Sequence, residues 1–295
     1  MKRKSFLVLA AICAFVLPGC KKNTSIKDTL KSVNGDKAHI VFLYGQSNAE
    51  GWSHNEYLKL NDIGKYNEYS NGYDNVYINF LNAGGQAGSD YTFEICKLGC
   101  GAGQGYFGPE VGIAEKMHDV HSNETTFIIK WAWGGTALYN MWLNGKKQRG
   151  DLYGGAIDFT KACLDYLKDK GYTLCLDGIC WMQGESDSME ITPEEYYNCT
   201  VAFVSYLRND LKKYQENIRF VDAGINETEG IWVNPDQINN FKKKFASESE
   251  LNFYVDTKEL GLSSVHEPYE TPDIAHWDSL SMVKLGQAFG EIVSK

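Results

Sequence analysis

Short, nearly continuous apolar runs recur along the chain and predict strands that are buried on both faces of a sheet. The first run covers residues 39–44 and is closed by Gly45. The others cover residues 76–81, 127–133, 176–182, 220–225 and 253–255.

Amphipathic stretches between and after these runs predict helices. One begins at Pro109-Glu110, where a proline suits the first turn and an acid suits the positive end of the helix dipole. Another covers residues 155–170 and ends at Gly171. Thr192 stands three residues before Glu195, which is a capping-box start. Residues 235–245 and 279–293 complete the set.

Strands that alternate with helices indicate βαβ units and a parallel sheet covered on both faces. The predicted fold class is therefore α/β, a three-layer α/β/α sandwich with a mostly parallel sheet. No internal repeat or shift of composition marks a second domain, so residues 37–295 are expected to form one domain. Residues 52–105 contain many Asn, Gly and Tyr residues with little periodicity, and we expect them to form long surface loops.

The amino-terminal residues have the features of an export signal. A basic start at residues 2–4 precedes an apolar run over 6–17, which is too short to cross a bilayer of about 30 Å. The run ends at Gly19-Cys20, which is similar to a bacterial lipoprotein processing site. We expect residues 1–19 to be a lipoprotein signal peptide and residues 20–36 to be the lipidated terminus, at Cys20, and a tether. An ordinary signal peptide with an incidental cysteine is the alternative.

Under either interpretation the protein is exported. If it is a lipoprotein, it is also held at a membrane, facing the periplasm or the cell exterior.

The net charge of the whole chain is −9, and loss of three basic groups with residues 1–19 lowers it to −12. So acidic a chain is not expected to bind nucleic acid, because phosphate binding depends on clustered Lys and Arg. Polyanionic substrates are disfavoured for the same reason.

Six cysteines remain after residue 20, and an even number favours disulfides in an oxidising compartment. The sequence does not choose among the possible pairings. Cys175 and Cys180 are an odd number of residues apart in a predicted strand, so they point to opposite faces and are not expected to bond. Cys96 and Cys100 lack a second ligand pair at metal-site spacing, and we expect no metal site.

Candidate chemistry lies where the strands end, because parallel α/β sheets bind ligands beyond the carboxyl ends of their strands. Ser47 follows the first strand within a tight turn, where a nucleophile can point outward. Near the carboxyl terminus, Asp273 precedes His276 by three residues, a spacing that lets one turn aim a carboxylate at Nδ1 of the imidazole. Gln183 and Glu185 follow the fourth long strand and are expected to face a cleft, since burial without partners would be costly.

Five motifs occur in a fixed order along the chain: Gly45-Gln46-Ser47-Asn48, Gly108-Pro109-Glu110, Trp133-Gly134-Gly135-Thr136, Trp181-x-Gln183-Gly184-Glu185 and Asp273-x-x-His276. Together they resemble the SGNH-type hydrolases, specifically the sialate O-acetylesterase and acetyl xylan esterase group of carbohydrate esterase family six. The resemblance covers residues 39–290 and implies a flavodoxin-like SGNH hydrolase fold.

This resemblance implies a serine esterase that removes O-acetyl groups from carbohydrate through an acetyl-serine intermediate. Its catalytic residues would be Ser47, His276 as general base and Asp273 as its orienting acid, and its oxyanion donors the backbone N–H groups of Ser47 and Gly108 with the side chain of Gln183. The supporting or substrate-binding residues would be Gln46, Asn48, Glu110, Gly135 and Glu185. The partner would be an acetylated glycan or sialic acid, between which the sequence does not choose, and no cofactor is implied.

Other interpretations are weaker. Residues 103–108 match a dinucleotide glycine pattern but do not follow an apolar strand. His118 and His121 are spaced for one helix face but lack further metal ligands. Glu185 and Asp187 are too close in sequence to flank a sugar bond as a glycosidase pair. A sugar-binding lipoprotein that keeps this fold without turnover is the alternative from another functional class.

Overall fold

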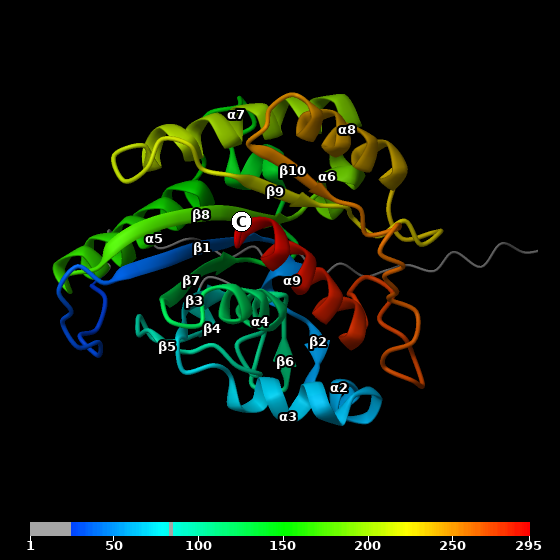
Figure 1. Cartoon of the computed structure of the whole chain (residues 1–295). Coiled ribbons are helices and arrows are strands. Elements are labelled where there is room, and N and C mark those ends of the chain that lie inside the picture. The colour runs from blue at the N-terminus through cyan, green and yellow to red at the C-terminus, as the bar shows by residue number, and fades with distance from the viewer. Residues whose placement is uncertain (1–24, 83–84) are drawn as a thin grey trace, which may run out of the picture.

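The computed structural model describes residues 25–82 and 85–295 (Figure 1). A sheet of eight strands forms its centre, in the order β10-β9-β8-β1-β7-β3-β4, with β5 also paired to β3. Only β4 and β5 run antiparallel to their neighbour β3. The strands are β1 (Lys37–Gly45), β3 (Val76–Asn82), β4 (Ala87–Gly88), β5 (Glu94–Ile95), β7 (Thr125–Ala132), β8 (Thr173–Met182), β9 (Phe220–Ala223) and β10 (Asn252–Val255), and a separate ribbon pairs β2 (Ser53–His54) with β6 (Tyr106–Phe107).

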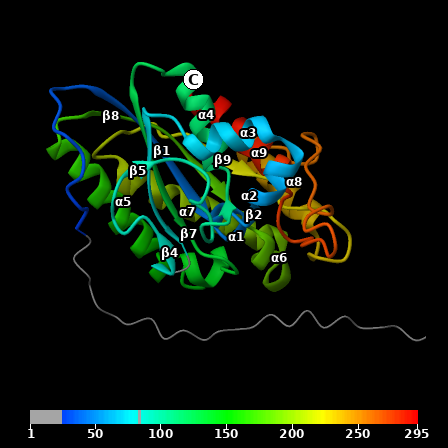
Figure 2. The same cartoon turned by 90° about the horizontal axis from the view of Figure 1, so that it is seen from below.

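Helices cover both faces of this sheet (Figure 2). Along β1, Ile40, Phe42 and Tyr44 face a core shared with α5, α7 and α8, whereas Val41 and Leu43 face a core shared with α4 and α9. The helices are α1 (Ser47–Glu50), α2 (Asn55–Asn61), α3 (Ile63–Asn71), α4 (Glu110–Val120), α5 (Asp151–Asp169), α6 (Glu185–Glu190), α7 (Pro193–Leu211), α8 (Pro235–Ser247), α9 (Ser279–Val293) and the π-helical turn η2 (Leu138–Trp142).

The predicted fold class is confirmed, and all six predicted strands and five predicted helices are present. The expectation that residues 52–105 form only long loops is wrong. This region contains α2 and α3 as well as short strands, and each of these helices buries a single side chain, Leu58 in α2 and Tyr69 in α3. One buried residue in each short helix leaves no periodicity to detect, although Asp62 caps α3 by accepting the backbone N–H of Lys65 at 2.9 Å.

The predicted helix at residues 155–170 begins earlier than expected, at Asp151. Two glycines, Gly154 and Gly155, therefore lie inside α5, where glycine is normally unfavourable. A Cβ added to Gly155 would lie 2.7 Å from the indole of Trp131 on β7. Glycine thus allows the helix to approach the sheet where a large ring projects from it.

Residues 1–19 and Cys20 lie outside the described residues, so the predicted signal peptide and lipid site stay predictions. Residues 25–36 belong to the predicted tether. Here the backbone N–H groups of Val33 and Gly35 donate to the carbonyl oxygens of Lys170 and Gly171, at 2.8 and 2.9 Å. This part of the tether is hydrogen-bonded to the end of α5. None of the helices in residues 25–82 and 85–295 has the length and apolar character needed to cross a membrane.

The cysteines at 96, 100, 163, 175, 180 and 199 are all free, so the disulfides that their even number favoured are absent from the described part of the chain. Cys175 and Cys180, which were not expected to bond to each other, are both among these free cysteines. Five of the six thiols are buried, and burial raises the pKa of Cys100 to about 12. They act as small apolar side chains.

The carboxyl ends of the three central strands are aligned. Gly45, the last residue of β1, pairs with Ala132 of β7 and with Met182 of β8. Each of these residues ends its strand, so the loops that follow the three strands start at the same level of the sheet. This alignment brings the motifs after residues 45, 132 and 182 together.

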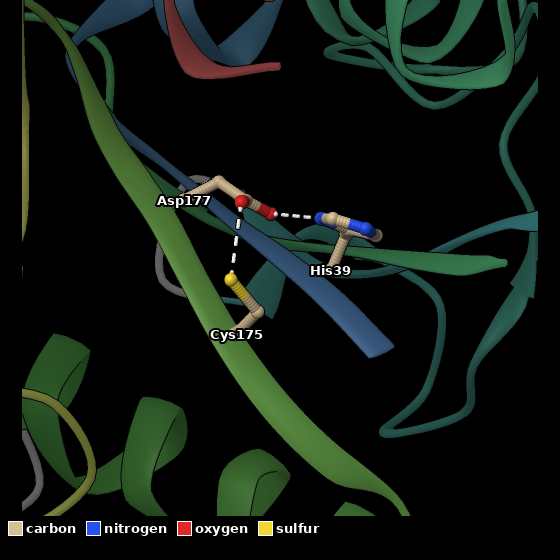
Figure 3. A group of neighbouring side chains, drawn as sticks. All are labelled: His39, Cys175 and Asp177. Carbon is tan, nitrogen blue, oxygen red and sulfur yellow. Dashed lines mark hydrogen bonds and ion pairs between the residues drawn. The ribbon is translucent and has the colours of Figure 1, made fainter. Parts of the chain in front are cut away.

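A buried ionic network lies near the opposite end of the same strands (Figure 3). His39 on β1 pairs in register with Cys175 on β8, and its Nδ1 lies 2.9 Å from Oδ2 of Asp177. Its Nε2 lies 2.6 Å from Oε2 of Glu124, just before β7. The ring of His121 stacks on that of His39 with 3.6 Å between centroids. Burial disfavours the imidazolium, but the two carboxylates outweigh it, and the pKa of His39 is raised.

We predict that His39 makes the stability of the fold depend on pH. Because folding raises its pKa above the ordinary value of 6.5, its contribution is complete below that pH and is lost as the pH rises through the folded-state pKa. The stability difference between the wild-type protein and His39→Asn should therefore shrink as the pH is raised from about 6 into the alkaline range. Urea unfolding of both proteins measures it.

The groups that face His39 are Asp177, Glu124, His121, Cys175 and Lys37. His121 acts in the opposite direction, since burial and the neighbouring His39 lower its pKa. Both proteins retain these neighbours, so the comparison measures His39 together with its effect on the pKa values of His121 and Glu124. A difference in the free energy of unfolding that stays constant over this range would contradict the prediction.

Candidate active site

Ser47 stands in a tight turn that only glycine permits. Gly45 has a φ of +149°, and a Cβ at this position would lie 2.0 Å from the carbonyl oxygen of Met182. The chain then turns through Gln46 into α1, and Ser47 is the first residue of that helix. The backbone N–H of a first helical residue has no partner within its own helix. Ser47 therefore carries both a half-buried hydroxyl and a backbone donor at the carboxyl end of β1.

His276 and Asp273 form the turn that their spacing predicted. Nδ1 of His276 lies 2.6 Å from Oδ2 of Asp273, and the backbone N–H of His276 donates to the carbonyl oxygen of Asp273 at 3.2 Å. Burial is the largest single influence and acts to raise the pKa of Asp273, but the hydrogen bond and charge of His276, the backbone N–H of Ala275 and the charge of His54 together outweigh it, and the pKa is lowered. The carboxylate is thus held ionised against the imidazole. The indole of Trp52 stacks on this imidazole, with 5.5 Å between centroids.

Asn48 joins the turn that carries Ser47 to the loop that carries His276. Its Oδ1 accepts the backbone N–H of Trp277 at 3.2 Å, and its Nδ2 donates to the carbonyl oxygen of Ala275 at 3.3 Å. These two residues flank His276, and Asn48 directly follows Ser47. In the described part of the chain no hydrogen bond joins Ser47 to His276, as is common for catalytic groups without a bound substrate. The triad role of the three residues stays a prediction.

Glu185 is a third hydrogen-bond partner of Asn48. It begins α6, is 3% exposed, and accepts Nδ2 of Asn48 on its Oε1 at 3.0 Å. Its Oε2 is buried without a hydrogen-bond partner in the described residues. The motif that ends at Glu185 thus contacts the turn that carries Ser47, whereas Asp187 bonds to the backbone of Leu138 and Tyr139.

A buried ion pair lies beneath the turn. Lys130 on β7 and Glu110 at the start of α4 are both fully buried, and Nζ lies 3.0 Å from Oε2 of Glu110. Nζ also donates to the carbonyl oxygens of Glu50 and Cys100, both at 2.8 Å. Oε1 of Glu110 accepts the backbone N–H of Gly108 at 2.7 Å. The pair therefore fixes the end of α1 against the segment that carries Gly108.

Gln183 occupies a buried polar cluster after β8. Its Nε2 donates to the carbonyl oxygen of Thr136 at 3.1 Å, to Oε1 of Gln46 at 3.2 Å and to Asp187. Asp187 also accepts the backbone N–H groups of Leu138 and Tyr139, at 2.7 and 2.9 Å, and so anchors η2. Burial nevertheless raises the pKa of Asp187 to about 6.

Two of the predicted oxyanion donors are thus already engaged. Gly108 donates to Glu110, and Gln183 donates within its cluster. To stabilise an oxyanion, each group would have to exchange its present hydrogen bond for one to the substrate. In this structure both groups instead hold the loops around the site together. Gly134 comes closer to Ser47, because a Cβ on it would lie 3.4 Å from Cβ of Ser47 and 2.8 Å from Oε2 of Glu50. Gly135 adopts a φ of +70°, which favours glycine.

Sequence reasoning missed three contributors to this site. Lys130 lies in a predicted strand, where a single lysine carries no signal of burial, and its acidic partner at 110 is distant in sequence. Trp52 gave a weak signal as an aromatic residue close to the first motif. Lys242 on α8 donates to the carbonyl oxygen of Gln183 and to Oδ1 of Asp222, both at 2.6 Å, and no motif contains it.

The side chains that could hold a metal ion lie away from this site. Donor atoms of His39, Cys175 and Asp177 are within 4.8 Å of one another, as are those of His39, His121 and Glu124. These atoms already pair among themselves in the ionic network. His118 bonds instead to Asn75 at 2.6 Å, so it does not join His121 in a shared ligand set.

We predict that the Lys130–Glu110 pair is essential to stability. Lys130→Met leaves Glu110 buried without its counter-charge, which should lower the free energy of unfolding by about 3–5 kcal/mol. Urea unfolding monitored by tryptophan fluorescence measures the loss.

Two further variants separate the ion pair from the loss of a lysine. Lys130→Met combined with Glu110→Gln removes both charges and should be more stable than Lys130→Met alone. Lys213→Met removes an exposed partner of Asp165 and should change the free energy of unfolding by less than about 1 kcal/mol. If Lys130→Met behaved like Lys213→Met, the role assigned to the buried pair would be incorrect.

Several solved structures and one protein-family model match this chain. Among curated protein sequences no match is found. A solved structure of a protein from Arabidopsis thaliana aligns with a TM-score of 0.61 and 20% identity, covering 86% of this chain and 97% of that one. NanS aligns with a TM-score of 0.62 and 17% identity, covering 88% and 98%. A carbohydrate acetylesterase from Xanthomonas citri aligns with a TM-score of 0.56 and 14% identity, covering 86% of this chain and 55% of that one.

At these identities the structural likeness shows a shared fold. The sequence itself matches the family model for "Carbohydrate esterase, sialic acid-specific acetylesterase" over residues 37–295. This match spans the domain that the sheet and its helices form, and it includes all five motifs. The chain belongs to the family of sialic acid-specific acetylesterases, a family of carbohydrate esterases.

Proposed function

We propose that this carbohydrate esterase hydrolyses O-acetyl esters of a glycan through an acetyl-serine intermediate, with Ser47 as nucleophile, His276 as general base and Asp273 as orienting acid. The observation that carries this proposal is the Asp273–His276 contact of 2.6 Å, together with the Asn48 bonds that tie the histidine loop to the serine turn. Membership of the family supports the ester as substrate.

The chemistry follows from these positions. Asp273 holds Nδ1–H of His276 and leaves Nε2 free to accept the hydroxyl proton of Ser47. Oγ attacks the acetyl carbonyl carbon, and the resulting tetrahedral intermediate collapses as the sugar oxygen leaves with that proton from His276. Water then gives a proton to Nε2 and attacks the acetyl-serine, which releases acetate and restores Ser47.

Charge on the carbonyl oxygen needs donors close to Ser47. The backbone N–H of Ser47 is one, since it begins α1. We assign the second to the backbone at Gly134-Gly135, which follows β7 beside β1 and packs against Ser47. In the described part of the chain neither glycine N–H donates to an acceptor. One such donor contributes about 3–4 kcal/mol of transition-state stabilisation.

Ser47→Ala should lower the rate of acetate release from 4-nitrophenyl acetate and from acetylated glycans by at least about a thousandfold, because only binding and oxyanion donors then remain. Steady-state kinetics measure the change. The matched control is Ser70→Ala on α3, whose hydroxyl bonds only to the backbone carbonyl of Tyr66 and which should retain the wild-type rate. Near-wild-type turnover by Ser47→Ala would exclude it as the nucleophile. If the chain only binds carbohydrate and does not turn it over, the wild-type protein should release no acetate.

We also propose that the chain is exported and anchored through lipidated Cys20. The sequence of residues 1–20 supports this proposal. Bacteria that express the full chain and are grown with a labelled fatty acid should incorporate label into the wild-type protein and not into Cys20→Ala. Detergent partitioning should shift in parallel. Equal labelling of the two proteins would exclude Cys20 as the lipid attachment site.

A further inference from the structure

Three side chains with metal-binding atoms converge near the amino-terminal ends of the central strands, away from the proposed active site. They are His39 on β1 and Cys175 and Asp177 on β8, and we call them the β1–β8 cluster. One donor atom from each side chain lies within 4.8 Å of the other two. Figure 3 shows the side chains directed toward one another from the two neighbouring strands. One ion can therefore contact all three, although they lie too far apart in sequence for any spacing to predict it.

The distances within the cluster are close to those of tetrahedral zinc coordination. Zinc binds sulfur at about 2.3 Å and nitrogen or carboxylate oxygen at about 2.0–2.2 Å, so neighbouring ligands of one ion lie about 3.3–3.6 Å apart. Sγ of Cys175 lies 3.5 Å from Oδ1 of Asp177. Nδ1 of His39 lies 2.9 Å from Oδ2 of Asp177, which is a hydrogen-bond distance. A small outward movement of one side chain converts this arrangement into a ligand set.

Glu124 holds the imidazole of His39 in the state that a metal ion requires. Its Oε2 lies 2.6 Å from Nε2 of His39, so Nε2 carries a proton and Nδ1 is the nitrogen that can bind an ion. Metal-binding histidines almost always donate their other N–H to such a partner, which fixes the ring and makes the ligand nitrogen more basic. The supporting carboxylate of a metal site is therefore already in place, one residue before β7.

An irregularity of the sheet directs Asp177 into the cluster. The register of the β1–β8 ladder shifts between Ile40 and Val41, so that Asp177 has no partner on β1. Asp177 is thus the extra residue of a β-bulge, a feature that redirects a side chain and often lies beside functional sites. Its side chain is only 8% exposed. The strand gives up regular pairing at the one position that supplies the oxygen ligand.

The charges of the cluster match a divalent cation. A thiolate at Cys175, a carboxylate at Asp177 and a neutral imidazole at His39 sum to the charge that one such ion neutralises. In the metal-free chain protons occupy two of these positions, because Nδ1 of His39 and Sγ of Cys175 both donate to Asp177. An ion displaces both protons on binding. Of the six cysteines in the described residues, only Cys175 is not buried, which gives the ion access from solvent.

A second group of donors, on the Nε2 side of the same imidazole, is less suitable. Donor atoms of His39, His121 and Glu124 also lie within 4.8 Å of one another. The two imidazole rings are stacked, with 19° between their planes. The lone pair of a ring nitrogen lies in the plane of its ring, so stacked rings direct their lone pairs nearly parallel and not toward one ion. Glu124 is also 36% exposed.

We propose that the β1–β8 cluster binds one zinc ion through Nδ1 of His39, Sγ of Cys175 and a carboxylate oxygen of Asp177, with water as the fourth ligand. Sulfur and imidazole ligands select zinc over calcium and magnesium, which take oxygen ligands. The ion joins β1 to β8, and through Glu124 it is connected to the start of β7. Its role is structural, because it ties the three central strands together at the end of the sheet opposite Ser47.

Metal binding by the full chain tests this proposal. After dialysis against a chelator, the wild-type protein should bind one zinc ion per chain with a Kd of about 1 μM or tighter, measured by competition with a chromophoric chelator. Zinc in about hundredfold excess over this Kd should raise the midpoint of thermal unfolding by about 5 °C or more. Calcium or magnesium at the same concentration should leave the midpoint unchanged. The pH dependence predicted for His39 applies to the chelator-treated, metal-free chain.

Variants identify the ligands. Cys175→Ser and Asp177→Asn each remove one ligand at nearly constant volume and should weaken zinc binding by at least about a hundredfold. Glu124→Gln keeps all three ligands and should weaken binding by about tenfold or more, because the carboxylate that supports the imidazole is lost. Cobalt bound to the wild-type chain should give a thiolate-to-cobalt charge-transfer band, which Cys175→Ser should abolish.

Matched controls lie outside the cluster. Cys180→Ala removes a thiol from the opposite face of β8, and His118→Asn removes a histidine that bonds to Asn75. Both variants should bind zinc with the wild-type Kd, and circular dichroism verifies that every variant is folded. A folded, chelator-treated wild-type chain that failed to bind zinc at micromolar concentration would overturn the proposal. Wild-type affinity in Cys175→Ser would do the same, because it would place the ion on other residues.

Discussion

The site depends on one contact between two strands. Gly45 packs so closely on the carbonyl of Met182 that no side chain fits at this position, and this contact makes β1 end level with β8. The chain must then turn out of the sheet at once, which places Ser47 at the start of α1. Because β7 ends at the same level, the loop that contains Gly134 arrives beside it. Parallel pairing thereby converts motifs separated by many residues into one surface.

Two buried lysines stabilise the loops on either side of that contact. Lys130 and Lys242 each direct Nζ at one carboxylate oxygen and two backbone carbonyls, which satisfies all three of its protons. Burying a charge is costly, and such pairs often add little net stability. Here the two lysines fix the positions of loops. The ends of strands and loops are left with unpaired carbonyl groups, and one ammonium group can bind several of them at once.

The sequence permitted prediction of the sheet, the long helices and the turn that joins Asp273 to His276, because each depends on local patterns of apolar residues, caps and short spacing. It did not permit prediction of α2 and α3, whose burial depends on one side chain apiece. It gave oxyanion roles to Gly108 and Gln183, which stay predictions, and it did not reveal the hydrogen bonds that these residues make in the structure. Their motifs were recognised from the sequence. In the structure Gly108 donates to the carboxylate of Glu110 and Gln183 donates to Asp187, and such hydrogen-bond partners are determined by tertiary packing. The buried lysines had no local signal at all.

The free cysteines have a consequence for how this domain can be handled. Its described residues contain no covalent cross-link, so the folded state is held by packing, hydrogen bonds and ion pairs alone. Oxidative folding catalysts have nothing to form in it, and thiol reductants have nothing to break.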